Sequence, residues 1–328
     1  MSALARELDP RPHANGALRQ EDTPRVESLI RLVGSKISLR VMIYRGHVSS
    51  LRSLVILNSV EYPMPPSVEF CEHMWAKGLQ VIFVERPGFG STASLPAALF
   101  TKEMIDNGAT AATEAVLLQR LIRQLELEDV VLLGMGSANP VSYRLAMIDP
   151  SISLAIYSNV VFNKDILDVF RPKWLQQMFR QMVQSNAGLK ITSMGFKHRL
   201  RHKPIEFYRH LMHQSAGDVA YLEANRDDFL SAASLFQNID HALINFDMKM
   251  SLATDHILKD DFFRGRNAVA LSGTETPEHW QTQLNSETAR LGIPVAYAPA
   301  GDFLVPYASP DFFSALVETH SARSRASQ

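Results

Sequence analysis

The sequence predicts an α/β fold built on a mostly parallel, twisted sheet, and three observations lead to this prediction. Short apolar runs alternate with longer segments of helical periodicity, which is the pattern of βαβ units. The runs are rich in Val, Ile and Leu without polar alternation, as expected of strands buried on both faces. Glycine-rich turns follow two of these runs directly. Together these features predict about eight strands with helices on both faces of the sheet.

The expected strands and helices follow one another in chain order. The strands are the apolar runs Ile37–Tyr44, Leu54–Leu57, Gln80–Glu85, Val130–Leu133, Ser153–Tyr157, Ala268–Leu271 and Pro294–Tyr297. The helices between them are Val68–Lys77, Ala109–Gln124, Pro140–Ile148 and a later one over about Thr276–Leu291. The second helix carries an apolar stripe that is expected to face the core, made of Leu117, Leu118, Leu121, Ile122 and Leu125.

The strand rhythm is interrupted between residues 163 and 261, where helical patterns occur almost without strand candidates. This interruption predicts a helical cap inserted into an α/β core of residues 26–162 and 262–320. Residues 1–25 and 321–328 are polar and lack periodicity, so they are expected to form a flexible arm and a tail.

The composition is that of an ordinary globular protein and excludes several function classes. Of 328 residues 46% are hydrophobic, and 33 Lys and Arg residues nearly balance 34 Asp and Glu residues. A net charge of -1 provides no general attraction for nucleic acid. The single cysteine, Cys71, excludes an internal disulfide and a thiolate metal cluster. With no apolar run long enough for a membrane span and no signal-peptide pattern, the expected location is the cytoplasm.

One motif has the outline of a nucleophile elbow. The strand Val130–Leu133 runs into Gly134-Met135-Gly136-Ser137-Ala138, and a helix follows. An elbow requires small residues two positions before and two positions after its tip, because the backbone there is strained and the helix packs close to the strand. In this register Gly134 and Ala138 are the flanks and Gly136 is the tip.

With two further motifs, the chain resembles the α/β-hydrolase superfamily over about residues 37–320. The turn Arg86-Pro87-Gly88-Phe89-Gly90 is similar to the family's loop after a central strand, and Ala298-Pro299-Ala300-Gly301-Asp302-Phe303-Leu304 is similar to the segment that usually carries the catalytic histidine. The resemblance implies an α/β-hydrolase fold with a cap, and a hydrolase whose elbow nucleophile is served by a histidine and an acid.

The residues at the catalytic positions depart from that pattern. Gly136 at the tip has no nucleophilic side chain, and Asp302 occupies the histidine position. The acid position falls on Thr276 with Glu275 beside it, and Asn58-Ser59 replaces the His-Gly pair that helps to form the family's oxyanion hole. Four departures in one site favour a pseudoenzyme, that is, a protein without the family's activity. No cofactor and no metal are expected.

The first functional hypothesis is therefore a non-catalytic protein that binds a small, largely apolar molecule between core and cap, or a protein partner. In the ligand version Asn58, Ser59 and Ser137 supply polar contacts, and Trp174 and Met178 supply apolar walls. The alternative is an active hydrolase of esterase or lactonase type, or a lyase, that uses Ser137 or a water positioned by Asp302 and Glu275. A third hypothesis is a regulatory subunit that docks through the basic run Lys197, Arg199, Arg201 and Lys203.

Other reactive side chains have simpler interpretations. Cys71 is expected to be a buried small hydrophobe, and Ser91 a turn residue. His198 with His202, and His210 with His213, have spacings that could place two rings on one helix face, but the positive charge around the first pair opposes a metal ion. His279 could replace the missing base only if it faced the site.

Overall fold

The computed structural model describes residues 24–45, 51–60, 62–89, 95, 101, 103–104, 108–158, 177, 186–239, 243–244, 247 and 258–326. The strands in this part of the chain are β1 (Arg25–Arg31), β2 (Ser38–Tyr44), β3 (Arg52–Leu57), β4 (Leu79–Val84), β5 (Val130–Met135), β6 (Ile152–Ser158), β7 (Ala268–Gly273) and β8 (Val295–Ala298). The helices of the core are α1 (Val68–Ala76), α3 (Ala109–Gln124), α4 (Asn139–Ile148), α11 (Glu278–Leu291), α12 (Val305–Ala308) and α13 (Pro310–Ala326).

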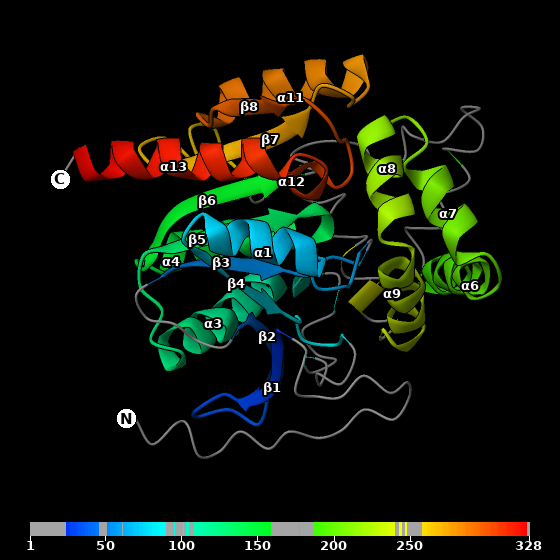
Figure 1. Ribbon diagram of the computed structural model, residues 1–328. Helices are drawn as coiled ribbons and strands as arrows, with labels where there is room; N and C mark the ends of the chain where they lie inside the picture. Colours follow the sequence, from blue (N-terminus) through cyan, green and yellow to red (C-terminus); the bar gives the residue numbers. More distant parts are fainter. Residues whose placement is uncertain are drawn as a thin grey trace.

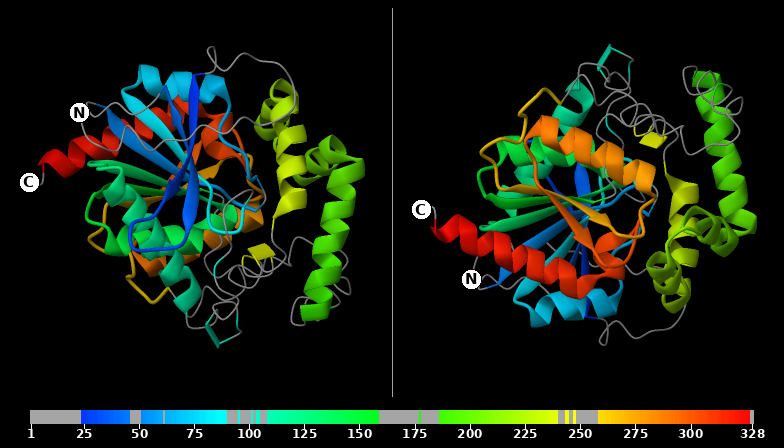
Figure 2. Two further views of the ribbon diagram at one scale, coloured as in Figure 1. Left: turned by 90° about the horizontal axis from the view of Figure 1, so that it is seen from below. Right: turned by 90° about the horizontal axis from the view of Figure 1, so that it is seen from above.

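The described strands form an 8-stranded sheet in the order β1-β2-β4-β3-β5-β6-β7-β8. Strand β2 pairs antiparallel with both of its neighbours, β1 and β4, and the other pairs are parallel. Helices α1 and α13 cover one face of the sheet, and α3, α4 and α11 cover the other (Figures 1 and 2). The predicted α/β fold with a mostly parallel sheet and helices on both faces is therefore confirmed.

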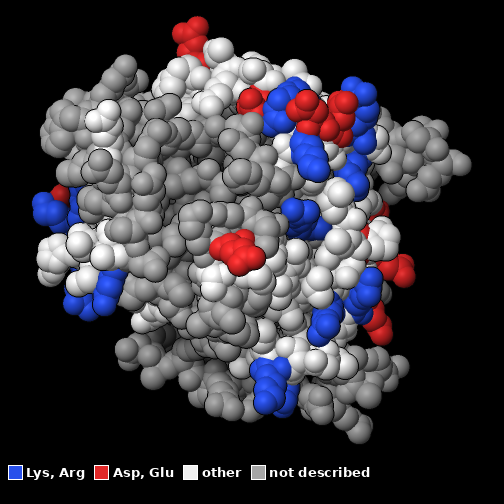
Figure 3. Space-filling view, turned by 180° about the vertical axis from the view of Figure 1, so that it is seen from behind, with Lys and Arg blue, Asp and Glu red and all other residues white. Residues whose placement is uncertain are grey.

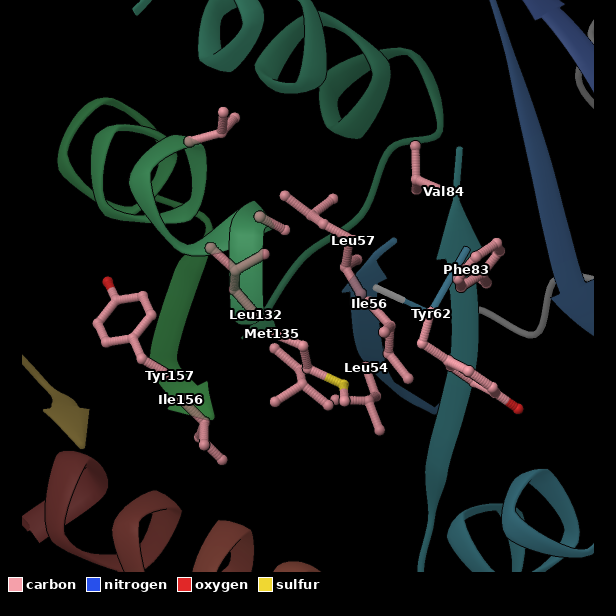
Figure 4. Close-up of a cluster of buried hydrophobic side chains, with 14 of the residues drawn as sticks. Leu54, Ile56, Leu57, Tyr62, Phe83, Val84, Leu132, Met135, Ile156 and Tyr157 are labelled. Carbon is pink, nitrogen blue, oxygen red and sulfur yellow. The ribbon is translucent and has the colours of Figure 1, made fainter. Parts of the chain in front are cut away.

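The central strands explain why the apolar runs could be recognised in the sequence. Every residue of β4, β5 and β7 is buried, as expected for parallel strands covered by helices on both sides. Figure 4 shows part of the resulting core, in which Leu54 and Ile56 of β3 lie near Met135 of β5 and Ile156 of β6.

Strand β1 is the strand of the described sheet that was not predicted from the sequence. Ile30 is the only buried residue among the seven of β1, and the strand also contains Arg25, Glu27 and Arg31. A strand at the edge of a sheet buries little and keeps charged side chains, so it gives no apolar run. Its pairing with β2 through all seven residues nevertheless makes it part of the sheet.

The described part of the predicted cap contains helices α6 (Asn186–His202), α7 (Pro204–Leu211), α8 (Ala216–Ala224) and α9 (Arg226–Asn238). These helices stand together beside the sheet, next to α12 (Figure 1). The predicted cap residues Trp174 and Met178 lie outside the described residues, and the boundaries of the arm, cap and tail stay predictions. None of the helices in the described ranges combines the length and hydropathy needed to cross a bilayer.

Candidate functional site

The predicted elbow is a sharp turn at the end of β5. Gly136 directly follows the strand with a φ of 48°, a backbone region that residues with a side chain rarely adopt, and a short 3₁₀ turn leads into α4. Gly134 is required by close packing, since a Cβ there would lie 2.5 Å from Ser142 Oγ and 2.8 Å from Asn139 Oδ1. The strand and helix thus meet as an elbow requires, with a residue lacking a side chain at the tip.

Ser137, the residue after the tip, has its hydroxyl engaged with the loop that follows β3. The Val60 N–H donates a hydrogen bond of 2.9 Å to Ser137 Oγ, and Ser137 is only 5% exposed. In elbow enzymes an N–H from this loop and the N–H of the residue after the nucleophile form the oxyanion hole. One potential oxyanion donor is therefore already occupied by a side chain of the protein itself.

Asn58 and Ser59, which begin the same loop, are both buried and each accepts a hydrogen bond from the main chain. Asn58 Oδ1 accepts from the Arg86 N–H at 2.8 Å, and Ser59 Oγ accepts from the Tyr62 N–H at 3.2 Å. Because Oδ1 accepts from the Arg86 N–H, Asn58 Nδ2 points away from that N–H. Among the described residues Asn58 Nδ2 has no hydrogen-bond partner, although Asn58 is 1% exposed.

Glu275, beside the predicted acid position, connects the core to the cap. Its Oε2 accepts from Ser215 Oγ at 2.7 Å, from the Gly217 N–H at 2.9 Å and from the Gly301 N–H at 2.8 Å. Burial favours a higher pKa for Glu275, but these hydrogen bonds outweigh it and lower the pKa from its ordinary value. A Cβ at Gly217 would lie 2.9 Å from the Gly301 nitrogen and 3.0 Å from Glu275 Oε2, so α8 packs closely on the carboxylate.

Asp302, at the histidine position, lies in a segment whose main chain is held by Asp218 of α8. The N–H groups of Asp302 and Phe303 donate to Asp218 Oδ2 at 2.9 and 2.6 Å, and the Leu304 N–H donates to Oδ1 at 3.0 Å. Burial raises the pKa of Asp218, and the three hydrogen bonds oppose that effect. The segment that carries the base in the resembled family is thus a structural contact between core and cap.

The structure therefore places the predicted site residues in two connected groups. Asn58, Ser59 and Ser137 meet through the loop after β3, and Glu275 meets the segment of Asp302 through Gly301. No protein-family model matches the chain, and no curated protein matches it.

Solved structures do resemble the chain over most of its length. The Cif epoxide hydrolase from Acinetobacter nosocomialis is 12% identical, with 90% of this chain and 89% of that one covered, at a TM-score of 0.63. A putative acyltransferase from Salmonella enterica is 16% identical, with coverages of 92% and 96% and a TM-score of 0.60. A bromoperoxidase from Bacillus anthracis is 15% identical, with coverages of 90% and 100% and a TM-score of 0.56. The chain has the α/β-hydrolase fold.

A second polar contact ties this α/β-hydrolase core to the chain after α9. Arg86, which is completely buried, binds Asp247 through two hydrogen bonds of 2.9 and 2.8 Å and Glu114 of α3 through its Nε at 2.5 Å. Burial favours a lower pKa for Arg86, but the two carboxylates outweigh it and raise the pKa. Burial raises the pKa of Glu114 despite the adjacent guanidinium.

Aromatic side chains fill the contact between the α/β-hydrolase core and the cap helices. Tyr62, from the loop after β3, has its ring centroid 5.0 Å from that of Phe229 on α9 and 6.0 Å from that of Tyr307 on α12. Tyr307 in turn stacks on Tyr221 of α8 at 5.5 Å. These rings are buried or nearly so, and they join the elements that surround the elbow.

A serine, a histidine and an aspartate also meet away from the elbow, between α1 and α13. His73 Nε2 lies 3.4 Å from Asp311 Oδ1 and 3.5 Å from Ser314 Oγ. A catalytic triad uses opposite ring nitrogens for the nucleophile and the acid. Because both contacts here involve the same nitrogen, this group does not have the geometry of a triad. His279 is exposed near the start of α11.

A pocket of about 350 Å³ lies between the end of α4, the start of β6 and the chain before β7, and Tyr143, Tyr157 and Phe263 are among its lining residues. The elbow is at the opposite end of these parallel strands, so this pocket is separate from it.

In the described part of the chain no group of three or more His, Cys, Asp or Glu residues could hold a metal ion. Cys71 is buried, and burial raises the pKa of its thiol to about 12.

Three residues of the site could not be recognised in the sequence as part of it. Val60 acts through its main chain, which leaves no trace in the residue type. Asp218 does have a local signal, because Ser215 caps α8 by accepting from the Asp218 N–H, as the spacing Ser-x-x-Asp predicts. That spacing predicts the start of a helix, but it does not predict the contact of Asp218 with residues 302–304. Asp247 is 161 positions from Arg86, and nothing local relates the two.

Proposed function

We propose that this protein is a pseudoenzyme of the α/β-hydrolase fold that binds a small, largely apolar molecule between its core and its cap. The observation that carries the proposal is Gly136 at the tip of the elbow. Hydrolysis through an elbow needs a hydroxyl, thiol or carboxylate at this position, and a glycine offers none. We also place the protein in the cytoplasm, on the basis of its single, buried cysteine.

The hydrogen bonds around the elbow support the same proposal. The Val60 N–H is engaged by Ser137, and the carboxylates of Glu275 and Asp218 accept hydrogen bonds from main-chain N–H groups. The Val60 N–H and the Glu275 carboxylate, which lie at or beside positions that the resemblance makes catalytic, here hold a loop and the cap in place. They would have to leave these partners in order to act on a substrate.

Asn58 is the best candidate for a polar contact with the ligand. Its Nδ2 is a buried donor without a partner among the described residues, and such a group is normally satisfied by a ligand or a water. We therefore expect the ligand to present a hydrogen-bond acceptor to Asn58. Trp174 and Met178 remain the proposed apolar walls, and Asp302, if ionised, would favour a ligand that also has a donor or a positive group.

The test measures binding and turnover on the same preparation. Native mass spectrometry of freshly purified protein is expected to detect a bound small molecule, and Asn58→Leu is expected to lose it while the protein stays folded by circular dichroism. Short-chain p-nitrophenyl esters are expected to be hydrolysed no faster than in buffer. Efficient turnover by the wild-type chain that Ser137→Ala abolishes would contradict the proposal.

The second candidate function is an active hydrolase that uses Ser137. It is favoured by the similarity to the structures of an epoxide hydrolase and a putative acyltransferase, and by the position of Ser137 next to the tip in a buried environment. For Ser137 to attack, its hydroxyl would have to turn away from Val60. A panel of esters, lactones and epoxides assayed with the wild type and with Ser137→Ala distinguishes the two functions, because only the second predicts a difference between these proteins.

A further inference from the structure

Helix α6 carries a concentration of positive charge that the proposed binding site does not use. The helix lies on the side of the cap that faces away from the sheet (Figures 1 and 2). It contains Lys190, Lys197, Arg199 and Arg201 but no Asp or Glu in its 17 residues, although the whole chain has a net charge of only -1. In the view from behind, which places the cap at the left, blue side chains at that edge stand beside only a small area of red (Figure 3).

The exposed side of α6 combines this charge with apolar side chains. Ile191 is 63% exposed and Met194 is 55% exposed, and the exposed His198 and Arg201 continue the same stripe at steps of four and three residues. The opposite side of the helix packs inward, as shown by Leu200, which is 2% exposed. Large apolar side chains left in solvent beside basic ones indicate an interaction surface.

Some basic residues of this run are engaged within the protein, and others are exposed and available for docking. Lys197 Nζ donates to the carbonyls of Gln237 and Ile239 at 2.9 and 2.8 Å, so it holds the end of α9. Lys203 pairs with Glu206 at 2.9 Å. Arg199 lies over the ring of Phe207 and is exposed, and Arg201 is also exposed. A surface on α6 therefore depends on Arg199 and Arg201 and not on the whole basic run.

We propose that the exposed face of α6, made of Lys190, Ile191, Met194, Arg199 and Arg201, docks the protein onto an anionic lipid surface. A helix that lies in the plane of a membrane interface has apolar side chains that enter the lipid and basic side chains that meet its headgroups. Because α6 lies on the outward side of the cap and these side chains are exposed, they are available to a flat surface. A second copy of the chain does not fit as the occupant, since two such faces would bring like charges together.

The test is co-sedimentation of the full-length protein with vesicles. We expect binding to phosphatidylcholine vesicles that contain about one third phosphatidylserine, little binding to pure phosphatidylcholine, and weaker binding as salt is added. Arg199→Gln with Arg201→Gln is expected to lower the affinity about 25-fold, at about fivefold for each arginine. Ile191→Ser with Met194→Ser is expected to lower it roughly tenfold.

The matched control replaces two exposed arginines of α3, Arg120→Gln with Arg123→Gln, and is expected to keep the affinity within about twofold of the wild type. Circular dichroism verifies that every variant is folded. An equal loss in the control, or no sedimentation with anionic vesicles, would overturn the proposal. Binding of polyglutamate through Arg199 and Arg201 without binding of vesicles would also overturn it, and would assign the face to an acidic protein partner.

Discussion

At the scale of single residues, Gly136 links the proposed absence of elbow catalysis to the geometry of the backbone. A residue with a side chain at a φ of 48° is strained, and enzymes with an elbow accept this strain in order to present the nucleophile. Glycine adopts the same conformation without a steric cost. The fold can therefore keep the sharp turn after β5 without the strain that a nucleophile would bring.

Gly136→Ser is expected to lower the free energy of unfolding by about 1 kcal/mol and to leave ester hydrolysis absent. The strain returns with the side chain, but Asp302 still occupies the position of the base. Urea denaturation and a p-nitrophenyl acetate assay measure the two effects. The control is Gly134→Ala, whose Cβ would lie 2.5 Å from Ser142 Oγ. Because of this crowding, Gly134→Ala is expected to lower the free energy of unfolding by about 2 kcal/mol or more. Strong esterase activity in Gly136→Ser would contradict this prediction, because it would show that catalysis does not need a histidine in place of Asp302.

Glu85, directly after β4, is a buried carboxyl whose titration should be visible in stability. Its Oε1 accepts from Arg40 at 3.3 Å, and its Oε2 has no partner among the described residues. Burial raises its pKa to about 7, although Arg40 opposes the shift. Between the unfolded pKa near 4.5 and the folded pKa near 7, the folded protein holds more of this proton than the unfolded chain. Stability from this group therefore falls as the pH rises through that window.

Glu85→Gln removes this titration, because the amide stays neutral. The free energy of unfolding of the wild type, relative to that of Glu85→Gln, is expected to fall by up to about 3 kcal/mol between about pH 5 and about pH 8. Urea denaturation of both proteins at several pH values measures the difference. Glu27→Gln is the control, because Glu27 also binds Arg40 but is 39% exposed. A difference that does not change with pH would show that Glu85 is ionised throughout.

The sequence was enough to predict the residue types at the candidate site, but not which hydrogen-bond partners those residues have. Gly136 and Asp302 stand out because a family motif fixes their positions, and the structure places Gly136 at the turn after β5. That Ser137 would meet Val60, or that Asp302 would lie beside Asp218, depends on loops that approach one another only in the fold. Hydrogen bonds to main-chain groups carry no residue code, so a single sequence does not contain them.

At the scale of elements, the central strands were predictable and the edge strand β1 was not, for one physical reason. A central strand that is buried on both faces needs apolar residues at every position. An edge strand that buries only a small area does not. Helices α1, α3 and α4 begin and end within a residue or so of the predicted ranges, because their apolar periodicity and flanking turns mark them. β1 lacks both signals.

The outer edge of β1 is partly closed by a side chain of α3. Gln124 Nε2 donates to the Arg31 carbonyl at 3.0 Å, and Gln124 Oε1 accepts from the Val33 N–H at 3.1 Å. The amide thus pairs with the strand as a further strand would. Gln124→Ala is expected to lower the free energy of unfolding by about 1 kcal/mol and to increase self-association, measured by light scattering at rising protein concentration.

The control for this edge is Gln119→Ala, also on α3. Gln119 Nε2 donates to the Ile148 carbonyl, so its loss removes a hydrogen bond without opening a strand edge. We expect this variant to be slightly destabilised and to scatter light as the wild type does. Equal association of both variants would mean that the edge of β1 is not the surface that associates.

At the scale of the whole molecule, several polar contacts among the described residues tie the cap to the core, including those of Glu275 with Ser215 and Gly217. Asp218 of α8 holds the main chain of residues 302–304, and Asp247, which follows α9, holds the buried Arg86. Aromatic contacts such as that of Tyr62 with Phe229 lie between cap and core as well. The contacts of Asp218 and Asp247 bring together residues 84 to 161 positions apart, which is why the cap could be predicted as a helical segment but its attachment could not.

Because Glu275 and Asp247 also hold the cap, loss of the Asp218 contact should loosen part of the cap without unfolding the core. Asp218→Asn replaces a carboxylate that accepts three N–H groups by an amide whose nitrogen cannot accept, and is expected to cost about 2 kcal/mol. Hydrogen exchange is expected to quicken in α8 and in residues 302–304 while β3 and β5 keep their protection. The control is Asp227→Asn, in the exposed first turn of α9, which should leave exchange unchanged. Faster exchange throughout the sheet in Asp218→Asn would instead mean that cap and core unfold as one unit.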